Sequence, residues 1–501
     1  MNLEYVEAGK KYKNIDFSVI KVVDAEYSKS IIAHENGNPF IEALPTIIPK
    51  REFALQSFRS VPDYKHELVS QMSDDERYLE VQKLRGVRFP LPYLNQIYKA
   101  FHTALRTSYS MRNLFPIDVD VTIRNENELS GLKSVSDDSG DPSNGFTLLG
   151  ASGCGKSSSI KMMLDQFPQL ILHKDKSYGE FLQIVYLKVN CLPNNNLSAL
   201  LDSIGKEIDK VLHNSVPVYE NEIKRAKTIG NKVNKVCSLI EVFSIGALIL
   251  DEIQLLNFDS NKETSFESIL AISNNTKIAI IAVGTEDAYA KMFPNLRTSR
   301  RTGMRIDASA YCRDKAFFIN ALSWIWRFQW FDEQLPQPTQ EIYDEFYSLT
   351  KGIIDQVIKI YIQMHLDYLQ NEERPCIDKD YIANIVTKYY PGTVAHLKKL
   401  PMKPTKISSE DVLTLKEMQC VEELKRVLAI TKKVYNKESI ANAIKKAAKK
   451  TKNMSVQDIV TDAYQILLKS PSDERRQKPA VKKKIDHEKE KDELLKTVKN
   501  L

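Results

Sequence analysis

Long apolar runs are missing from this 501-residue sequence. A membrane-spanning helix needs roughly 20 consecutive, mostly apolar residues, and no stretch approaches that length, so we expect no membrane segment. The first residues, MNLEYVEAGKKYKN, contain neither an apolar core nor a small-residue cleavage site, which argues against a signal peptide. From these absences we expect a cytoplasmic protein.

Clustered metal ligands are also missing. The eight histidines are dispersed, and the six cysteines stand far apart, at positions 154, 191, 237, 312, 376 and 420. No pair has the close spacing of a zinc motif, so a cysteine-based metal site is not expected. In a reducing compartment such cysteines act as small apolar side chains.

The positive charge is uneven along the chain. The net charge is +6, but Lys432–Leu501 alone contains 19 Lys and Arg against 10 Asp and Glu. Lysine-rich tails of this kind contact nucleic acid in many proteins, and in others they are simply solvated. Composition leaves both interpretations open for the tail.

The first 110 residues show two local patterns. Pro92–Met111 has apolar residues three and four positions apart, which predicts an amphipathic helix. GNPFIEALP (Gly37–Pro45) is a short apolar segment bracketed by prolines, which favours an extended docking strip over a helix. The turn-rich segment Ser134–Gly145 then predicts a loop.

Strands and helices alternate after that loop. Five strands are expected, at 146–150, 183–190, 247–252, 277–285 and 304–311, with helices at 156–167 and 197–213. The third and fourth strands each have a continuous apolar run, as expected when helices cover both faces of a sheet. The alternation predicts an α/β fold, a parallel sheet with helices on both faces.

Strand signals stop at Arg313, and helical periodicity follows. Tryptophans 324, 326 and 330 are expected in the core of this helical part. A helical lid after an α/β nucleotide domain is the order typical of AAA+ ATPases. We therefore predict four parts: an N-terminal extension (1–110), an α/β nucleotide-binding domain (111–312), a helical lid (313–400), and a helical C-terminal region with the basic tail (401–501).

The sequence GASGCGKS follows the first expected strand and opens a helix. It matches G-x-x-x-x-G-K-[ST], whose backbone N–H groups surround phosphate oxygens at a helix N-terminus. Lys156 is expected to bind the β- and γ-phosphates of ATP, and Ser157 to ligate Mg²⁺. The expected ATP-binding residues are Gly150, Ala151, Ser152, Gly153, Cys154, Gly155, Lys156, Ser157 and Ser158.

ALILDE ends the third strand with two acids. Asp251 is expected to hold Mg²⁺ through water, and Glu252 to orient the attacking water, which is the role that distinguishes a hydrolase from a passive binder. Thr285 ends the next strand, where AAA+ proteins place a polar sensor of the γ-phosphate. Thr285 also precedes an acidic helix start and suits an N-cap, and the two roles are compatible.

Two basic segments have alternative interpretations. Arg297, Arg300 and Arg301 are candidates for an arginine finger that reaches a neighbouring subunit's ATP, or for a solvated or DNA-contacting loop. Between the second and third strands, five basic residues are spaced so that they can share a helical face, either solvated or in contact with DNA phosphates: Lys224, Arg225, Lys227, Lys232 and Lys235.

With these motifs in place, the chain resembles the TnsC family, AAA+ regulators of bacterial transposons. The similar stretches run in order over roughly residues 38–370. They are NPFIEALP (38–45), QIVYLKVNC (183–191), LILDEIQLL (248–256), NLRTSRR (295–301) and GIIDQVIKIYI (352–362).

The resemblance implies a homo-oligomer, a ring or a helical assembly, built with ATP on double-stranded DNA independently of its sequence. It further implies partners: a target-selector protein and the transposase subunits, which the oligomer links so that insertion is activated. ATP would then lie between subunits, which supports the arginine-finger interpretation. No membrane partner is implied, and the expected location is the bacterial cytoplasm, on DNA.

One departure from the AAA+ pattern concerns the lid. Many lids carry G-x-x-R, whose arginine senses the γ-phosphate, and here Gly352 is followed three positions later by Asp355, with Lys359 one turn further. A weakened sensor suits slow, DNA-stimulated hydrolysis that resets an assembly.

Two other functions compete with the transposition regulator. The first is an initiator or helicase loader of the same superfamily acting in DNA replication, although its usual winged-helix module is not evident after the lid. The second is a passive scaffold in which ATP is only structural. The pair Asp251–Glu252 argues against the scaffold, which has no need of the second acid.

Overall fold

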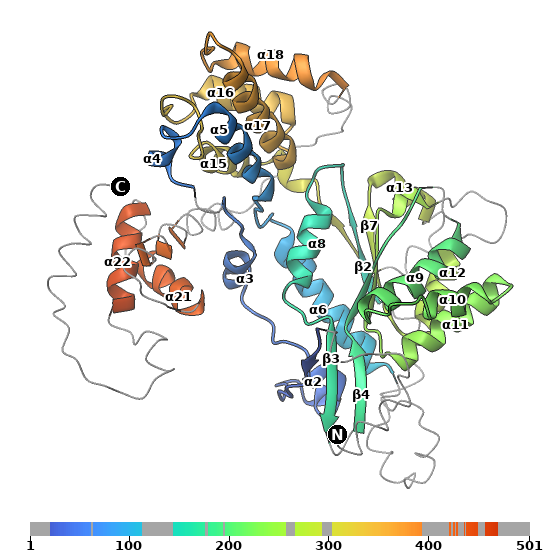
Figure 1. Ribbon diagram of the computed structural model, residues 1–501. Coiled ribbons are helices and arrows are strands. Elements are labelled where there is room, and N and C mark those ends of the chain that lie inside the picture. Colours follow the sequence, from blue (N-terminus) through green and yellow to red (C-terminus); the bar gives the residue numbers. More distant parts are fainter. Residues whose placement is uncertain are drawn as a thin grey trace, which may run out of the picture. The chain divides into compact units, whose positions relative to one another are not determined.

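The computed structural model describes two compact units (Figure 1). Unit 1 comprises the described residues up to Ile47 and those of Gln96–Ser309, and unit 2 those of Ile48–Asn95 and Ala310–Leu501. Within the described residues, no helix combines the length and the apolar character needed to cross a membrane. The described residues are 21–61, 64–112, 144–175, 179–193, 196–256, 266–292, 303–392, 420, 421, 424, 425, 427, 428, 435, 437–448 and 456–468.

Unit 1 is built on a five-stranded sheet in which every pairing is parallel. The strand order is β5-β6-β7-β2-β8, so β2, the first of them in the chain, lies between β7 and β8. Every residue of β6 and β7 is buried, as expected for strands covered on both faces. The five strands are β2 (Gly145–Leu149), β5 (Tyr186–Asn190), β6 (Ala247–Asp251), β7 (Ala279–Gly284) and β8 (Met304–Asp307).

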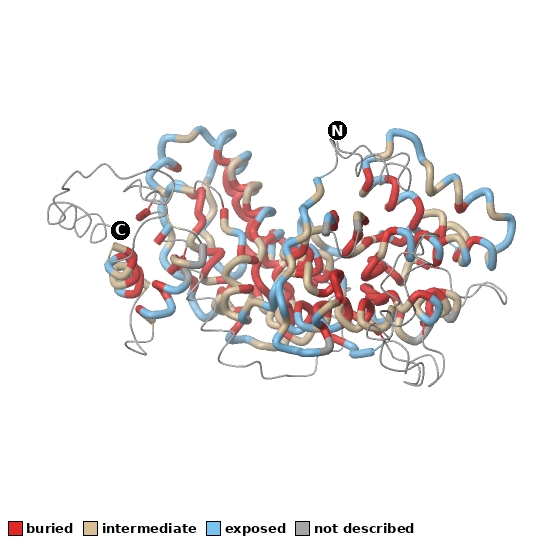
Figure 2. The backbone as a smooth tube through the Cα atoms, turned by 90° about the horizontal axis from the view of Figure 1, so that it is seen from below, coloured by how far each residue is buried: buried red, intermediate tan, exposed pale blue. Residues whose placement is uncertain are grey.

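Helices cover both faces of this sheet. In Figure 1, α6 and α8 lie to one side of the strands and α9 to α12 to the other. Figure 2 colours the backbone by burial, with the buried residues in red. The helices are α6 (Leu94–Ser110, in unit 1 from Gln96), α8 (Lys156–Leu164), α9 (Leu197–Val211), α10 (Tyr219–Lys224), α11 (Ile229–Val242), α12 (Phe266–Thr276) and α13 (Glu286–Met292), with a short 3₁₀ helix η5 (Ile253–Leu255). The predicted α/β fold is confirmed.

A second, smaller sheet was not expected from the sequence. It has the order β1-β3-β4, in which β1 (Val23–Asp24) runs parallel to β3 (Leu170–Asp175) and β3 forms an antiparallel pair with β4 (Gly179–Ile184). The single strand expected over 183–190 is therefore wrong. Its apolar run belongs to β4 and then to β5, because at Val185 the chain passes from one sheet to the other, and a continuous apolar run gives no sign of such a break.

The expectation of an extended strip at Gly37–Pro45 is also wrong. Residues Pro39–Glu42 form the short helix α2, where the Asn38 side chain accepts hydrogen bonds from the N–H groups of Phe40 and Ile41. A proline at the first helical position favours this start, because its missing N–H would have no helical partner there. Phe40 and Ile41 are buried, and Phe40 stacks on Tyr109 with ring centroids 5.3 Å apart. The segment therefore packs inside unit 1.

Unit 2 is helical in its described residues, apart from an isolated bridge between Arg59 and Arg88. The expected loss of strands after Arg313 is confirmed for those residues. Tryptophans 324, 326 and 330 are at most 2% exposed, as predicted for core residues. The helices are α3 (Lys50–Ser57), α4 (His66–Val69), α5 (Asp74–Glu80), α15 (Lys315–Ile325), α16 (Gln340–Thr350), α17 (Ile354–Gln370), α18 (Lys379–Tyr389), α21 (Lys437–Ala448) and α22 (Val456–Leu468), with 3₁₀ turns η1 (Ala33–Glu35) in unit 1 and η2 (Val81–Gly86) and η6 (Ala310–Arg313) in unit 2.

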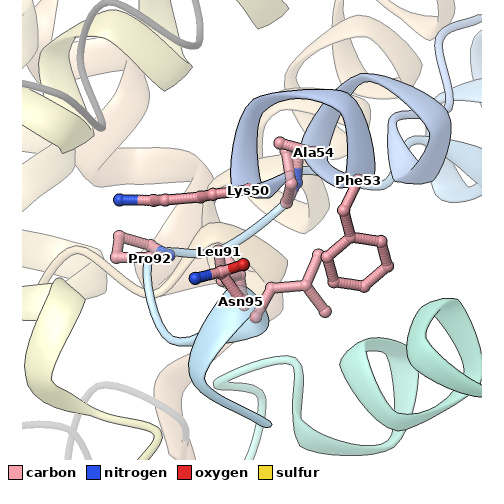
Figure 3. Close-up of a pocket in the computed structure, with 8 residues that line it drawn as sticks. Lys50, Phe53, Ala54, Leu91, Pro92 and Asn95 are labelled. Atoms are coloured by element: carbon pink, nitrogen blue, oxygen red, sulfur yellow. The ribbon is translucent and has the colours of Figure 1, made fainter. Parts of the chain in front are cut away.

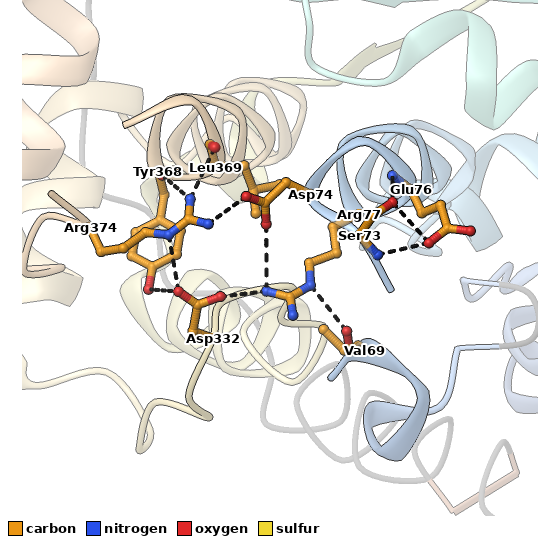
Figure 4. Close-up of polar contacts among 9 residues, drawn as sticks. All are labelled: Val69, Ser73, Asp74, Glu76, Arg77, Asp332, Tyr368, Leu369 and Arg374. Carbon is orange, nitrogen blue, oxygen red and sulfur yellow. Dashed lines mark hydrogen bonds and ion pairs between the residues drawn. The ribbon is translucent and has the colours of Figure 1, made fainter. Parts of the chain in front are cut away.

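An ion network ties the N-terminal part of unit 2 to its later helices (Figure 4). Arg77 of α5 bonds Asp332 at 2.5 Å, and Arg374 bonds both Asp332 and Asp74, at 3.1 and 2.5 Å. Burial raises the pKa of Asp332, but hydrogen bonds from Arg77 and Tyr368 and the charge of Arg374 outweigh it, so the net pKa is lowered. Residues 48–95 thus pack in unit 2, and the four-part domain division stays a prediction.

His365 of α17 gives unit 2 a pH dependence. The ring stacks on Phe331 with centroids 4.0 Å apart, and Nδ1 bonds the carbonyl of Tyr361 at 2.8 Å. Burial lowers the pKa of His365 to about 4, against a weaker raising effect of that bond. In the unfolded chain His365 therefore binds a proton near pH 6.5, whereas in the folded unit it binds one only near pH 4. Its stabilising contribution is complete above pH 6.5 and decreases as the pH falls toward 4.

We expect His365→Phe to flatten the pH dependence of thermal unfolding. A shift of this size corresponds to roughly 3 kcal/mol of stability lost at pH 4, at 1.36 kcal/mol per pKa unit. Thermal unfolding at pH 7 and pH 4.5 should show a smaller difference in the variant than in the wild type. As a control, His213 is exposed and its left-handed backbone suits asparagine, so His213→Asn should keep the wild-type difference. If His365→Phe keeps the wild-type difference in thermal unfolding between pH 7 and pH 4.5, His365 is not the source of this pH dependence.

Candidate nucleotide-binding site

The phosphate loop has the geometry expected from its sequence. β2 ends at Leu149, α8 begins at Lys156, and the loop lies between them. Gly153 and Gly155 have φ angles of +82° and +77°, in the left-handed region that other residues rarely occupy. This backbone lets the loop curl ahead of the N-terminus of α8, where N–H groups and the helix dipole favour an anion.

Lys156 folds back over its own loop. Its Nζ donates to the carbonyl oxygens of Gly150 and Ala151, at 2.9 and 3.0 Å, and the residue is only 7% exposed. Burial lowers the pKa of Lys156, and the nearby negative charges of Glu252 and Asp251 partly offset this. The ammonium group is therefore held at the loop by contacts that an incoming phosphate can replace with stronger, charge-assisted ones.

The two expected Mg²⁺ ligands lie together. Ser157 Oγ donates to Asp251 Oδ1 at 3.2 Å, and Asp251 is 3% exposed. A hydroxyl and one carboxylate suit Mg²⁺, because this ion prefers oxygen ligands. It usually keeps several waters and binds phosphate oxygens of the substrate, so few protein ligands are needed. Accordingly, no group of three His, Cys, Asp or Glu suited to a metal ion occurs among the described residues.

Lys188 was not singled out from the sequence, yet it contacts the same acid. Its Nζ lies 2.8 Å from Asp251 Oδ2. The register of β5 against β6 pairs Asn190 with Asp251, so Lys188 lies two positions along the neighbouring strand. The only sequence signal is one lysine in an otherwise apolar strand. Its charge partly neutralises Asp251 at the expected metal position.

Glu252 follows Asp251 with a left-handed backbone, φ +58°. Its N–H donates to Asp251 Oδ1 at 3.0 Å, and its exposed carboxylate accepts from Gln254 Nε2. Gln254 Oε1 accepts in turn from the N–H of Thr285 at 3.1 Å. Gln254 therefore connects the backbone of Thr285 to the carboxylate of Glu252, while the sensor role of Thr285 stays a prediction. Gln254 was missed because nothing in the sequence gives its side chain a role.

Ser309 is a further residue that the sequence did not reveal. Its Oγ accepts from the N–H of Ala151 at 2.8 Å, and its own N–H donates to Asp307 Oδ1 at 2.8 Å. Because β8 is hydrogen-bonded to β2, the end of β8 lies next to the start of the phosphate loop. Ser309 thus fixes the first turn of the loop from the neighbouring strand.

Residues 143–292 match the family model described as "AAA domain". This segment contains the phosphate loop, Asp251 and Glu252, and four of the five strands. Unit 1 therefore contains an AAA domain. The expected fold class, an AAA+ P-loop domain with a helical C-terminal region, is confirmed.

Solved structures of low sequence identity that are similar to this chain include the following two. Cdc6p from Pyrobaculum aerophilum is 14% identical, with 71% of this chain and 79% of that chain covered and a TM-score of 0.34. The Aeropyrum pernix ORC1 protein in complex with DNA is 10% identical, with 73% and 86% covered and a TM-score of 0.33. No curated protein matches the chain.

The five basic residues expected to share one helical face do not do so. Lys224 ends α10, Arg225 and Lys227 lie in the connection, and Lys232 and Lys235 belong to α11. The expectation is wrong because Thr228 caps the start of a new helix, its side chain accepting from the N–H of Asn231.

Three of the four lysines in this segment pair with acids of the AAA domain. Lys224 pairs with Glu220 at 2.6 Å, and Lys235 pairs with Glu222. Lys232 is buried and bonds Asp202 at 2.6 Å. Arg225 and Lys227 are exposed, so they are the members of the segment best placed to meet DNA phosphates. Their contact with DNA stays a prediction.

The three finger candidates, Arg297, Arg300 and Arg301, lie outside the described residues. In unit 2, Lys359 pairs with Asp355 at 2.6 Å. The lysine one turn beyond the position of the missing lid arginine is thus bonded to the acid that stands at that position.

Unit 2 also contains a small cavity between α3 and the start of α6 (Figure 3). Its volume of about 20 Å³ admits a single water-sized molecule. An organic ligand does not fit, so we assign no binding site here. The lining residues are Lys50, Phe53, Ala54, Pro90, Leu91, Pro92, Leu94 and Asn95.

Proposed function

We propose that this protein is an ATP-dependent, DNA-binding regulator of DNA transposition. It assembles as an oligomer on duplex target DNA with ATP and Mg²⁺, and hydrolysis of the ATP resets the assembly. The observation that carries the ATP-dependent part of the proposal is the convergence of four residues at one edge of the sheet. Lys156 and Ser157 of the phosphate loop lie beside Asp251 and Glu252 of the neighbouring motif.

Each residue of this site has a distinct task in the proposed reaction. Lys156 leaves the loop carbonyls and binds the β- and γ-phosphates. Ser157 and Asp251 hold Mg²⁺, which neutralises charge on the phosphate oxygens when bound. Glu252 accepts a hydrogen bond from the attacking water and orients it toward the γ-phosphate. Positioning and electrostatic stabilisation supply most of the catalysis in such a reaction.

The role in transposition rests on the sequence resemblance to the TnsC family. The proposed partners are a target-selector protein and the transposase subunits, and the proposed DNA contact is independent of base sequence. Slow hydrolysis is part of the proposal, because the lid position of the sensor arginine holds Asp355, paired with Lys359. A DNA-stimulated rate of ATP hydrolysis well above roughly 10 per second, an ordinary enzyme rate, would contradict slow hydrolysis as the step that resets the assembly.

The proposed function can be tested by fluorescence anisotropy of a labelled duplex. Binding should be tight with ATP or a non-hydrolysable analogue, and weak with ADP or without nucleotide. Several unrelated duplex sequences should bind equally, since phosphate contacts carry no sequence information. Equal binding in all four nucleotide conditions would exclude a nucleotide-controlled switch. A strong preference for one defined sequence would favour an initiator instead.

We expect Arg225→Glu with Lys227→Glu to weaken DNA binding and reduce its salt dependence. Each phosphate contact contributes a slope of about −0.9 in log K against log salt concentration, so losing two should reduce the slope by about 2. A matched control is Lys206→Glu with Lys210→Glu, two exposed lysines of α9, which should change the slope less. Wild-type affinity and slope in the Arg225/Lys227 variant would exclude this segment as a DNA contact.

A further inference from the structure

The side chain of Gln254 joins two parts of the AAA domain site. Its Oε1 accepts from the Thr285 N–H at 3.1 Å, and its Nε2 donates to Glu252 Oε2. The orientation of the amide follows from chemistry, because a backbone N–H can only donate and a carboxylate can only accept. The amide oxygen therefore bonds Thr285, and the amide nitrogen bonds Glu252.

The neighbouring strand leaves room for this side chain. Gly284, the last residue of β7, has no side chain, and a Cβ there would lie 2.6 Å from Gln254 Oε1 and 2.8 Å from Ile253 Cγ2. Both distances are shorter than carbon atoms tolerate against their neighbours. A side chain at the end of β7 would therefore displace Gln254 from the position in which it reaches Thr285.

The backbone conformation of Glu252 is held by two hydrogen bonds. Its left-handed conformation is uncommon for a residue with a side chain, and it persists because the Glu252 N–H bonds Asp251 and the Glu252 carbonyl accepts from Leu255 N–H at 2.9 Å. The exposed carboxylate, in contrast, would be free to change rotamer. Its hydrogen-bond partner on the described part of the protein is Gln254.

We infer that Gln254 is a positioning residue for ATP hydrolysis: it holds the Glu252 carboxylate in a fixed place relative to Thr285 and the end of β7. This inference rests on the proposed function, and within it Gln254 does not itself touch the substrate. Hydrolysis depends on a water held in line with the γ-phosphate, and small misplacements of the group that orients it cost large factors in rate. Binding of ATP depends on Lys156 and the loop instead, so Gln254 should influence the rate and not the affinity.

The first test compares two variants of the full-length protein. Gln254→Met keeps the size of the side chain and removes both hydrogen bonds, and Gln254→Glu keeps an acceptor for the Thr285 N–H but places a carboxylate against Glu252. We expect kcat to fall about 10- to 100-fold in Gln254→Met, in line with the cost of a misplaced catalytic group, and further in Gln254→Glu. The Kd for ATP should stay within about twofold of the wild type. Gln56→Met, which removes a glutamine–glutamate bond of 3.0 Å in unit 2, should leave kcat unchanged.

The second test separates positioning from a general structural role. In a Glu252→Gln background, Gln254→Met should lower the residual rate no further, because residues that act as one unit are not additive. Gly284→Ala, which displaces Gln254 without changing it, should lower kcat in the same way. If Gln254→Met fails to fold, Gln254→Asn, too short to reach both partners, replaces it in each measurement.

The outcomes distinguish this inference from the proposed function. A wild-type protein that does not hydrolyse ATP overturns the proposed function. A wild type that does hydrolyse ATP, with Gln254→Met at an equal or higher kcat, overturns the positioning role and leaves the proposed function standing. An equal loss of ATP affinity and rate, or a further loss in the Glu252→Gln background, also overturns it in favour of a structural role.

Discussion

Lys156→Ala is expected to abolish ATP binding and DNA loading together. The Lys156 ammonium group lies at the phosphate loop, buried and held by the carbonyls of Gly150 and Ala151. Removing it takes away the positive charge that faces the β- and γ-phosphates. A charge-assisted contact in a buried site contributes about 3–4 kcal/mol, so the affinity should fall roughly 10²- to 10³-fold.

Binding of a fluorescent ATP analogue, followed by duplex anisotropy in the same sample, measures both losses. Lys156→Met, which keeps the length of the side chain, should behave like Lys156→Ala and exclude an effect of the missing bulk. Lys161→Ala is the matched control, because Lys161 is exposed on the same helix, α8. A Lys156→Ala protein that loads on DNA as well as the wild type would overturn the proposed switch.

Glu252→Gln is expected to bind ATP normally and to hydrolyse it about 10²- to 10⁴-fold more slowly, the range for losing a general base. The amide has the shape of the carboxylate but lacks the charge needed to orient and polarise a water. Because hydrolysis is what resets the assembly, the variant should stay on DNA for longer after unbound ATP is removed.

Phosphate release and the dissociation rate from a duplex measure the two effects. Glu207→Gln is a suitable control, since Glu207 lies on α9 and pairs with Lys210 at 3.1 Å. Hydrolysis at the wild-type rate in Glu252→Gln would assign the catalytic role to another residue. Slow hydrolysis with unchanged dissociation from DNA would separate hydrolysis from resetting.

The parts of the site that the sequence predicted are those coded by neighbouring residues. Gly150–Ser157 fixes a loop between a strand and a helix, and Asp251–Glu252 ends a buried strand. In a parallel sheet, the carboxyl ends of adjacent strands meet at one edge. Short local patterns were therefore enough to place Lys156, Ser157 and Asp251 together.

The parts that the sequence did not predict depend on register and on distant contacts. Lys188 reaches Asp251 because of how β5 pairs with β6, and Ser309 reaches Ala151 because β8 adjoins β2. The order of strands across a sheet cannot be inferred from the residues of any single strand. The same holds for Arg77 and Asp332, which lie 255 positions apart in the sequence and bond in unit 2.

The errors have local causes as well. The basic segment from Lys224 to Lys235 has helical spacing, but Thr228 starts a new helix within it, and spacing alone does not reveal such a break. The prolines of NPFIEALP favour an extended segment, although a proline in the first turn suits a helix. In both cases a capping side chain decided the structure over the apolar or charged pattern.

Electron microscopy of the full-length protein with duplex DNA tests the central claim most directly. The comparison is between samples with and without a non-hydrolysable ATP analogue, at one salt concentration. We expect ordered rings or helical assemblies around the DNA only when the analogue is present. The same assemblies without nucleotide, or none in either sample, would contradict an ATP-controlled oligomer on DNA.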